Sequence, residues 1–167
     1  MPNLILSQTN GIARIILAQA PVNVIDIALM KEIDAAIDAA RDAKVIVIGA
    51  QGKFFSAGVD VKDHTADRVE EMITRFDALI EKIWNLPQPT IAAVQGSALG
   101  GGLELAMACD FIVASSAAKF AQPEIQVGVF PPIAAVLLPF LISNKKAFEM
   151  MMTGDAIDAP TAERLGL

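Results

Sequence analysis

The chain has 167 residues, a formal net charge of −6 and a hydrophobic fraction of 54%. This length suits one domain over residues 1–167 with a sizeable core, and the acidic balance excludes the basic surface that nucleic-acid binding requires. Every apolar run is broken by Lys, Asp, Glu or Pro before it reaches the roughly 20 residues of a membrane span, so we expect no membrane-spanning helix.

The N-terminal residues bear on the cellular location of the protein, and the numbers of Cys and His bear on disulfides and metal binding. Cys109 is the only cysteine and His64 the only histidine. An internal disulfide is therefore excluded, and we expect no metal site. The first residues, Met-Pro-Asn-Leu, lack the basic and long apolar stretches of a signal peptide. We expect a cytoplasmic protein.

The first third of the chain predicts a hairpin, a helix and a buried strand. Residues 4–17 alternate around an Asn-Gly pair, which is typical of two strands joined by a tight turn. Asp26 can cap a helix whose apolar positions recur at helical spacing over residues 30–40. Residues 45–48 are uniformly apolar, as in a parallel sheet covered on both faces.

The rest of the chain continues to alternate between helices and strands. The predicted elements are a long amphipathic helix over residues 69–83, a buried strand over 90–94, a short glycine-led helix that reaches Cys109, a strand over 111–114, an edge strand at 119–120, and a helical remainder interrupted by Pro131-Pro132. Such alternation predicts an α/β domain with right-handed crossovers. In open sheets of this kind, ligands bind beyond the carboxyl ends of the strands.

Two runs of small residues fall at such strand ends, over residues 55–60 and 98–104. By itself Ala57-Gly58 is an ordinary flexible turn. Three successive glycines over residues 100–102 are different, because each costs roughly 1 kcal/mol relative to alanine in a helix. Close approach of the backbone to a ligand is the commonest reason for them, and the spacing is not that of a phosphate loop. Two such turns aimed at one oxygen would form an oxyanion hole.

Two glutamates accompany these turns. Glu104 has apolar neighbours on both sides, whereas a helical glutamate is ordinarily a solvated surface charge. A buried carboxylate needs a partner, a proton or a chemical task. Glu124 follows in the run Gln-Pro-Glu and is a second candidate. Two carboxylates with separately tuned pKa values suit general acid–base chemistry.

Residues 54–124, which contain both turns and both glutamates, resemble the enoyl-CoA hydratase/isomerase (crotonase) family. The resemblance implies the ClpP/crotonase fold, an α/β fold of repeated β-β-α units. It also implies that the N–H groups of Ala57 and Gly101 hold the thioester oxygen. In hydratases of the family, the residue matching Glu104 activates water and the one matching Glu124 exchanges a proton at the α-carbon.

The presence of both glutamates favours a hydratase, an enzyme of the hydro-lyase type. An isomerase of the same family and a catalytically silent scaffold are the alternatives. The resemblance implies an acyl-CoA thioester as substrate, with CoA as part of the substrate and no separate cofactor. The residues matched to substrate and CoA binding are Asn23, Val24, Ala57, Gly58, Val59, Asp60, Val61, Gly100 and Pro132. We expect the Asp60 side chain to be structural and His64 to lie in a cap or a solvated loop.

Pro132 stands where most of the family has glycine, so a backbone donor is lost and the wall becomes stiffer and apolar. This segment resembles the branch that hydrates cyclic dienoyl-CoA thioesters in the degradation of aromatic compounds, cyclohexa-1,5-diene-1-carbonyl-CoA hydratase among them. A linear enoyl thioester of fatty acid metabolism would fit an apolar wall too.

The family forms trimers or pairs of trimers, and the apolar stretch over residues 127–142 predicts faces covered by other subunits. We expect a homotrimer or a dimer of trimers for the intact protein. Residues 162–167 stop inside a motif after which family members continue. We expect the C-terminal helical part to be missing, in a fragment or in a naturally short protein, with weakened association.

Overall fold

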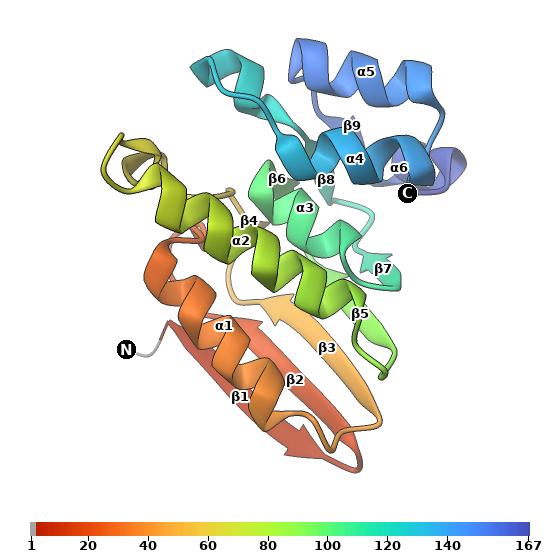
Figure 1. The fold of residues 1–167 in the computed structure, drawn as a ribbon. Coiled ribbons are helices and arrows are strands. Elements are labelled where there is room, and N and C mark those ends of the chain that lie inside the picture. The colour runs from red at the N-terminus through yellow and green to blue at the C-terminus, as the bar shows by residue number, and fades with distance from the viewer. Residues whose placement is uncertain (1–2) are drawn as a thin grey trace.

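The fold is built on two β-sheets (Figure 1). The computed structural model describes residues 3–167; Met1 and Pro2, which begin the stretch examined for a signal peptide, lie outside it. In chain order the elements are β1 (Leu4–Thr9), β2 (Ile12–Leu17), α1 (Ile27–Ala39), β3 (Val45–Ala50), β4 (Phe54–Ser56), η1 (Val61–His64), α2 (Val69–Trp84), β5 (Thr90–Val94), β6 (Ser97–Leu99), α3 (Gly101–Met107), β7 (Phe111–Ala114), β8 (Lys119–Ala121), η2 (Pro123–Val127), α4 (Pro132–Leu141), α5 (Asn144–Thr153), β9 (Ile157–Asp158) and α6 (Ala159–Leu165), where η marks a 3₁₀-helix.

The larger sheet has the strand order β1-β2-β3-β5-β7. Strands β1 and β2 form the predicted antiparallel hairpin, and the other pairs are parallel. Asn10 and Gly11 both have positive φ, 53° and 79°, as the tight turn between twisted strands requires. The predicted strands over residues 45–48, 90–94 and 111–114 are confirmed as β3, β5 and β7.

The smaller sheet has the order β4-β6-β8-β9 and gives the fold its repeat. Successive units β3-β4-α2, β5-β6-α3 and β7-β8-α4 each place their first strand in the larger sheet and their second in the smaller one. The predicted α/β fold of β-β-α units is thereby confirmed. The prediction of an edge strand at residues 119–120 is wrong, because β8 pairs with β6 on one side and with β9 on the other.

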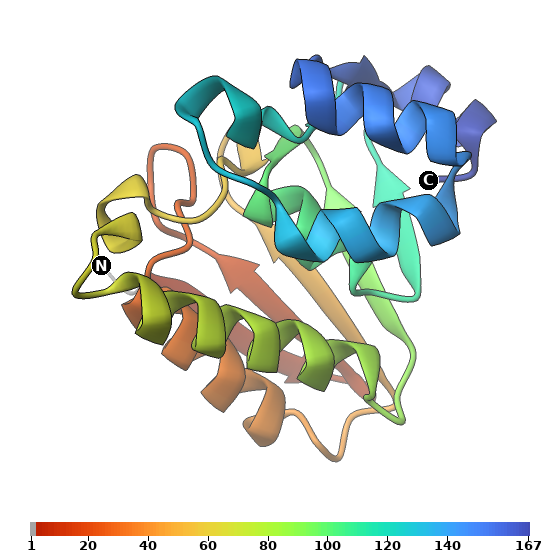
Figure 2. The same cartoon turned by 45° about the horizontal axis from the view of Figure 1, so that its top comes forward.

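Helices α1 and α2 lie side by side across one face of the larger sheet (Figures 1 and 2). The side chain of Asp26 accepts a hydrogen bond from Leu29 N at 2.7 Å, so the predicted cap of α1 is confirmed. The side chains of α2 that were expected on its inner face are buried from Met72 to Ile83. Helices α4, α5 and α6 lie at the other end of the molecule, by the smaller sheet (Figure 2).

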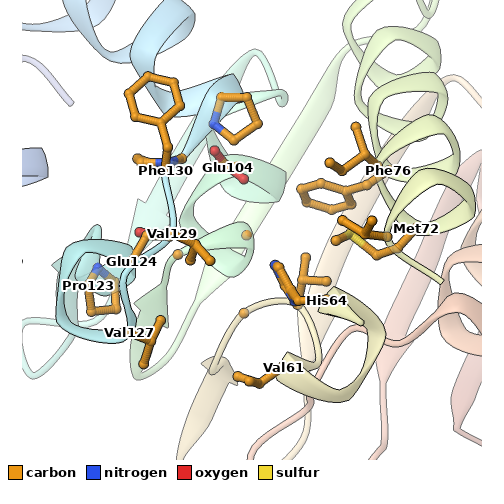
Figure 3. Close-up of a pocket in the computed structure, with 18 of the residues that line it drawn as sticks. Val61, His64, Met72, Phe76, Glu104, Pro123, Glu124, Val127, Val129 and Phe130 are labelled. Carbon is orange, nitrogen blue, oxygen red and sulfur yellow. The ribbon is translucent and has the colours of Figure 1, made fainter. Parts of the chain in front are cut away.

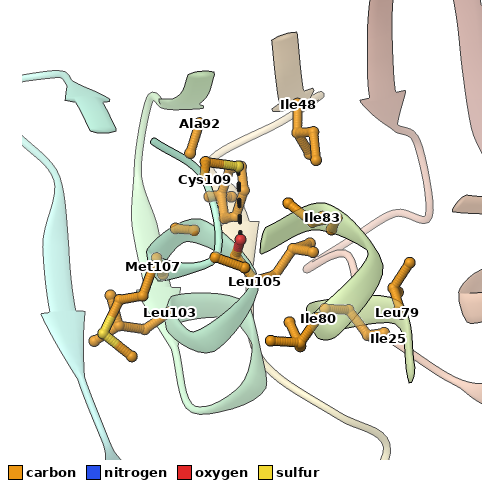
Figure 4. Close-up of a cluster of buried hydrophobic side chains, with 14 of the residues drawn as sticks. Ile25, Ile48, Leu79, Ile80, Ile83, Ala92, Leu103, Leu105, Met107 and Cys109 are labelled. Atoms are coloured by element: carbon orange, nitrogen blue, oxygen red, sulfur yellow. Dashed lines mark hydrogen bonds between the residues drawn. The ribbon is translucent and has the colours of Figure 1, made fainter. Parts of the chain in front are cut away.

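Helix α3 is the centre of the core (Figure 4). All seven of its residues are buried, and its apolar side chains meet those of α2 and of the larger sheet. Cys109, just beyond α3, donates from Sγ to Leu105 O at 3.8 Å, and burial raises the pKa of its thiol to about 12. This burial of α3 on all sides fixes the position of the glycines that open it. No helix within residues 3–167 has the length and apolar character to cross a bilayer.

Candidate active site

A cavity of about 590 Å³ opens beyond the carboxyl ends of β4, β6 and β8 of the smaller sheet (Figure 3). One side comes from η1 and α2, and the other from the start of α3, η2 and the segment that leads into α4. Figure 3 shows Glu104 and Glu124 on the second side and Phe76 and Met72 facing them from the first. The lining is mainly apolar, so water offsets only part of the free-energy cost of placing a charged group against the cavity.

The two turns of small residues meet at one end of this cavity, as predicted. A Cβ added to Gly101 would lie 2.6 Å from Val59 Cγ2 and 3.2 Å from Val59 N. One added to Gly58, where φ is +102°, would lie 3.0 Å from Leu99 O. Only glycine allows the two backbones to approach so closely. A Cβ on Gly100, where φ is +52°, would collide with Glu124 Oε1.

In each turn, the earlier N–H groups are already hydrogen-bonded. Ala57 N donates to Val22 O at 2.9 Å, and Gly58 N to Ser56 Oγ at 3.1 Å. The N–H of Ala57, which the sequence analysis assigned to the thioester oxygen, is therefore engaged within the protein. In the second turn, Gly100 N donates to Ala121 O at 2.9 Å.

The next N–H group in each turn is placed differently. In the first turn, Ile25 N donates to Gly58 O and Asp60 N donates to Ile25 O. Neither of these two hydrogen bonds involves Val59 N. Gly101 is the first residue of α3, where an N–H has no partner inside the helix. Within residues 3–167, neither Val59 N nor Gly101 N donates a backbone hydrogen bond in the turns, loops and helix caps. The N–H groups available at the two turns are therefore those of Val59 and Gly101, and not those of Ala57 and Gly101 as expected.

Glu104 is held by the N-terminus of helix α4. Its side chain is buried, with 4% relative exposure, and Oε1 accepts a hydrogen bond from Ala134 N at 2.7 Å. Burial raises the pKa of Glu104 to about 8, and repulsion from Glu124 and Asp77 adds to this effect. Hydrogen bonds from the N–H groups of Ala134 and Ile133 oppose it. The carboxyl is thus poised to exchange a proton near neutral pH.

Glu124 lies in η2 and is partly buried. Burial raises the pKa of its carboxyl, and a hydrogen bond from its own N–H opposes the rise. The buried amide of Gln122, turned so that its NH₂ faces the carboxylate, donates to Oε1 at 3.2 Å and to Oε2 at 3.1 Å. No pattern in the sequence indicates this contact of Gln122 with Glu124.

The residues matched to substrate and CoA binding divide into two groups. Those that line the cavity are Ala57, Gly58, Val59, Val61, Gly100 and Pro132. Asn23, Val24 and Asp60 are outside its lining. Asn23 Nδ2 donates to the carbonyl oxygens of Gln51 and Phe54, both at 2.9 Å. Asp60 Oδ1 accepts from Lys62 N at 2.9 Å and so caps η1, as expected for a structural side chain.

The contributions of α2 and of His64 to the cavity were not predicted from the sequence. Met72, Ile73, Phe76 and Asp77 line it from one stripe of α2, and His64 lines it from η1. The helical spacing of the α2 residues was visible in the sequence, but it indicates a buried face without telling core from cavity. Residues 3–167 contain no group of three or more His, Cys, Asp or Glu side chains placed to hold a metal ion.

Comparison with known proteins agrees with this geometry. The model of the enoyl-CoA hydratase/isomerase family matches residues 7–167. A protein of Rhizobium meliloti described as a probable enoyl-CoA hydratase is 42% identical over 98% of this chain and 66% of its own length. A cyclohexa-1,5-dienecarbonyl-CoA hydratase of Thauera aromatica is 33% identical over 97% of this chain and 64% of its own.

Solved structures show the same fold. The crystal structure of human enoyl-CoA hydratase domain-containing protein 3 superposes with a TM-score of 0.94 at 34% identity, covering 99% of this chain and 68% of that one. The chain belongs to the enoyl-CoA hydratase/isomerase family. It spans slightly less than two thirds of the length of the curated relatives it matches.

Proposed function

We propose that this chain carries the active site of an acyl-CoA hydratase, a hydro-lyase that adds water across the C=C bond of an enoyl-CoA or cyclic dienoyl-CoA thioester. One observation carries the proposal: the N–H groups of Val59 and Gly101 lie together at a cavity that also holds Glu104 and Glu124. Donors for an oxyanion and a pair of acid and base groups are the two requirements of this reaction.

In this proposal, Val59 N and Gly101 N donate hydrogen bonds to the thioester oxygen. As water adds to the β-carbon, negative charge moves onto that oxygen, and preorganised donors stabilise it by several kcal/mol. The first position of α3 adds the positive end of a short helix to the same oxygen. The CoA moiety is the carrier part of the substrate, and we propose no separate cofactor.

The two glutamates supply and remove the protons. Burial raises the pKa of both carboxyls, and repulsion between them favours a pair that shares one proton. Such a pair offers one base, which takes a proton from water, and one acid, which protonates the α-carbon. We assign the base role to Glu104 and the acid role to Glu124. The pair keeps its one proton up to about pH 8, so we expect the rate to fall as the pH rises through about 8 and that proton is lost.

The acyl group that we propose is a cyclic dienoyl, with a linear enoyl group as the second candidate. Phe130, Pro131 and Pro132 form an apolar wall of the cavity, which supports a ring but also suits a linear chain. The Thauera relative is named for a cyclic dienoyl substrate, whereas the Rhizobium relative is described only as an enoyl-CoA hydratase. The first assignment places the protein in the degradation of aromatic compounds, and the second in fatty acid metabolism.

The test follows the loss of ultraviolet absorbance of crotonyl-CoA and of cyclohexa-1,5-diene-1-carbonyl-CoA on incubation with the 167-residue chain. Glu104→Gln and Glu124→Gln should each lower kcat by about 100-fold or more while the fold and acyl-CoA binding remain. Glu163→Gln, an exposed change in α6, is the matched control. Binding without turnover of either thioester would support a silent scaffold. Exchange of solvent deuterium into the α-carbon that survives in Glu104→Gln, without hydration by the wild type, would support an isomerase.

The remaining proposals concern organisation. One hydrophobic cluster reaches from Ala13 to Ala162, which supports a single domain over residues 1–167. Phe130, Phe140 and Phe148 are exposed, at 64%, 82% and 57% of their surface. Such apolar side chains support the proposal of a homotrimer or a dimer of trimers, in which other subunits cover them. Light scattering of the intact protein tests this. A cytoplasmic location stays a prediction.

A further inference from the structure

His64 is a polar side chain on the apolar wall of the cavity. It is the last residue of η1, it is partly buried, and it lines the cavity near Val61 and Met72 (Figure 3). The sequence analysis expected a cap or a solvated loop at this position. The structure instead turns the only imidazole of the chain towards the space enclosed by the two glutamates.

A hydrogen bond fixes which nitrogen of His64 carries the proton. Nδ1 lies 3.0 Å from the carbonyl oxygen of Asp60. A carbonyl oxygen only accepts hydrogen bonds, so Nδ1 is the donor. In the neutral ring, Nε2 then carries the lone pair and accepts. The ring is thereby held in one orientation by the backbone of its own 3₁₀-helix, with its accepting nitrogen left for another partner.

Asp77 is a second acceptor that lines the same side of the cavity. It lies on α2, one residue beyond Phe76 and in the stripe that faces the cavity. Its charge raises the pKa of Glu104, which shows that the two carboxyls are within electrostatic reach of one another. The side of the cavity formed by η1 and α2 therefore carries two polar residues, the half-buried His64 and the exposed Asp77, beside the apolar side chains of Met72 and Phe76.

The charges around the cavity restrict what these acceptors can bind. Asp77, Glu104 and Glu124 line it, and none of the lining residues is Lys or Arg. An acyl group with its own carboxylate would be repelled. An ammonium group would be attracted by the three carboxylates but would lose its hydration against Phe76 and Met72. A hydroxyl group is neutral, donates to either acceptor and places its carbon against the apolar wall.

We propose that His64 and Asp77 select acyl-CoA substrates whose acyl group carries a hydroxyl beyond the reacting C=C bond. This inference rests on the proposed function and narrows its substrate class. His64 is here a specificity-determining residue: it contacts the remote part of the acyl group and takes no part in the transfer of protons at the double bond. A hydroxyl that donates to one of these acceptors forms a hydrogen bond that the unsubstituted analogue cannot form, so the two thioesters are discriminated.

The experiment compares matched thioesters. Unsubstituted 2-enoyl-CoA substrates of one chain length are measured beside analogues that carry a hydroxyl, or an ammonium group, at successive carbons beyond the double bond. For the wild type, we expect kcat/KM to be about tenfold or more higher for one hydroxylated analogue than for the unsubstituted substrate. His64→Leu should remove this preference, so that kcat/KM becomes equal for the hydroxylated and the unsubstituted substrate.

Three variants separate recognition from a loss of structure. His64→Gln retains a side chain that can hydrogen-bond and should keep part of the preference, and Asp77→Leu should reduce it. Thr74→Val removes a hydroxyl from the exposed part of α2 that does not line this cavity, so it should leave the ratio unchanged. A defect that is merely structural would lower kcat/KM for all thioesters equally and would not move the ratio.

Failure of this inference is distinguishable from failure of the proposed function. If the wild type hydrates unsubstituted and hydroxylated thioesters equally well, or prefers the ammonium analogue, the assignment of His64 and Asp77 is wrong and the hydratase remains. If the wild type neither binds nor hydrates any of the thioesters by calorimetry and absorbance, the proposed function is wrong and this inference falls with it.

Discussion

Replacing Glu104 with Gln measures the free-energy cost of burying this carboxyl. The side chain is 4% exposed, and Gln has nearly the same size and shape. Its Oε1 can still accept the hydrogen bond that Ala134 N donates at 2.7 Å. The substitution therefore removes the ionisable group while keeping the packing of α3 against α4. Any change of stability that depends on pH then reports on the ionisation of Glu104.

The direction and size of the effect follow from the pKa. In the unfolded chain this carboxyl releases its proton around pH 4.5, whereas in the folded protein it keeps the proton up to about pH 8. Between these values the folded state binds more protons, so its stability falls as pH rises. The loss is about 1.4 kcal/mol per pH unit and accumulates to roughly 5 kcal/mol above pH 8. Glu104→Gln has no such loss.

Urea unfolding of both proteins at pH 5, 6, 7 and 8 tests this. The free energy of unfolding of Glu104→Gln, minus that of the wild type, should increase by about 2.5 kcal/mol between pH 5 and pH 7. Glu71→Gln is the control, because a hydrogen bond from Arg75 holds the pKa of the exposed Glu71 below its usual value of 4.5, so its stability difference should stay nearly constant from pH 5 to pH 8. If the difference in unfolding free energy between Glu104→Gln and the wild type stays constant with pH, burial does not raise the pKa of Glu104 and the reasoning is wrong.

Three further predictions concern packing and backbone contacts. Gly101→Ala brings a Cβ within 2.6 Å of Val59 Cγ2, so it should separate the two donor N–H groups and lower kcat for crotonyl-CoA by about 100-fold or more, with acyl-CoA binding measured in parallel. Phe55→Ala empties a fully buried position and should lower the free energy of unfolding by about 3–5 kcal/mol in urea titrations. Asp110→Ala leaves Thr90 N and Oγ1 without the carboxylate that accepts from them at 2.7 and 2.8 Å, and should cost about 1–3 kcal/mol in thermal unfolding. If Phe55→Ala or Asp110→Ala is as stable as the wild type, or if Gly101→Ala is fully active, the importance assigned to the contact concerned is wrong.

Local signals in the sequence were sufficient for the elements whose partners lie nearby in the chain. The Asn-Gly turn at residues 10–11 sets the register of β1 and β2, and Asp26 begins α1. The short strands β4 and β6 were taken only as turns, because three residues carry no periodicity that could identify a strand. The interior position of β8 depends on β9, which returns from the far end of the chain and has only two residues.

The candidate site shows the same division between local and distant information. The small residues and the two glutamates could be found from sequence, since small size and an apolar surrounding are local properties. Which N–H group is free could not, because Ala57 N is engaged by Val22 O from a different part of the chain. The role of His64 was likewise hidden, because neighbouring charges suggest a solvated residue and only the packing of η1 against α2 turns it towards the cavity.

Glu104 links the candidate chemistry to the stability of helix α4. This helix begins at Pro132, and Pro131, which precedes it, has no side chain that could cap it. A proline at the first helical position loses an N–H that would have had no partner inside the helix. The N–H groups of Ile133 and Ala134 remain, and the Glu104 carboxyl accepts from them as a cap would. The proton on Glu104 and the docking of α4 therefore depend on the same contacts, so the apolar segment of residues 130–132 is held in place by a group to which we assign a role in catalysis.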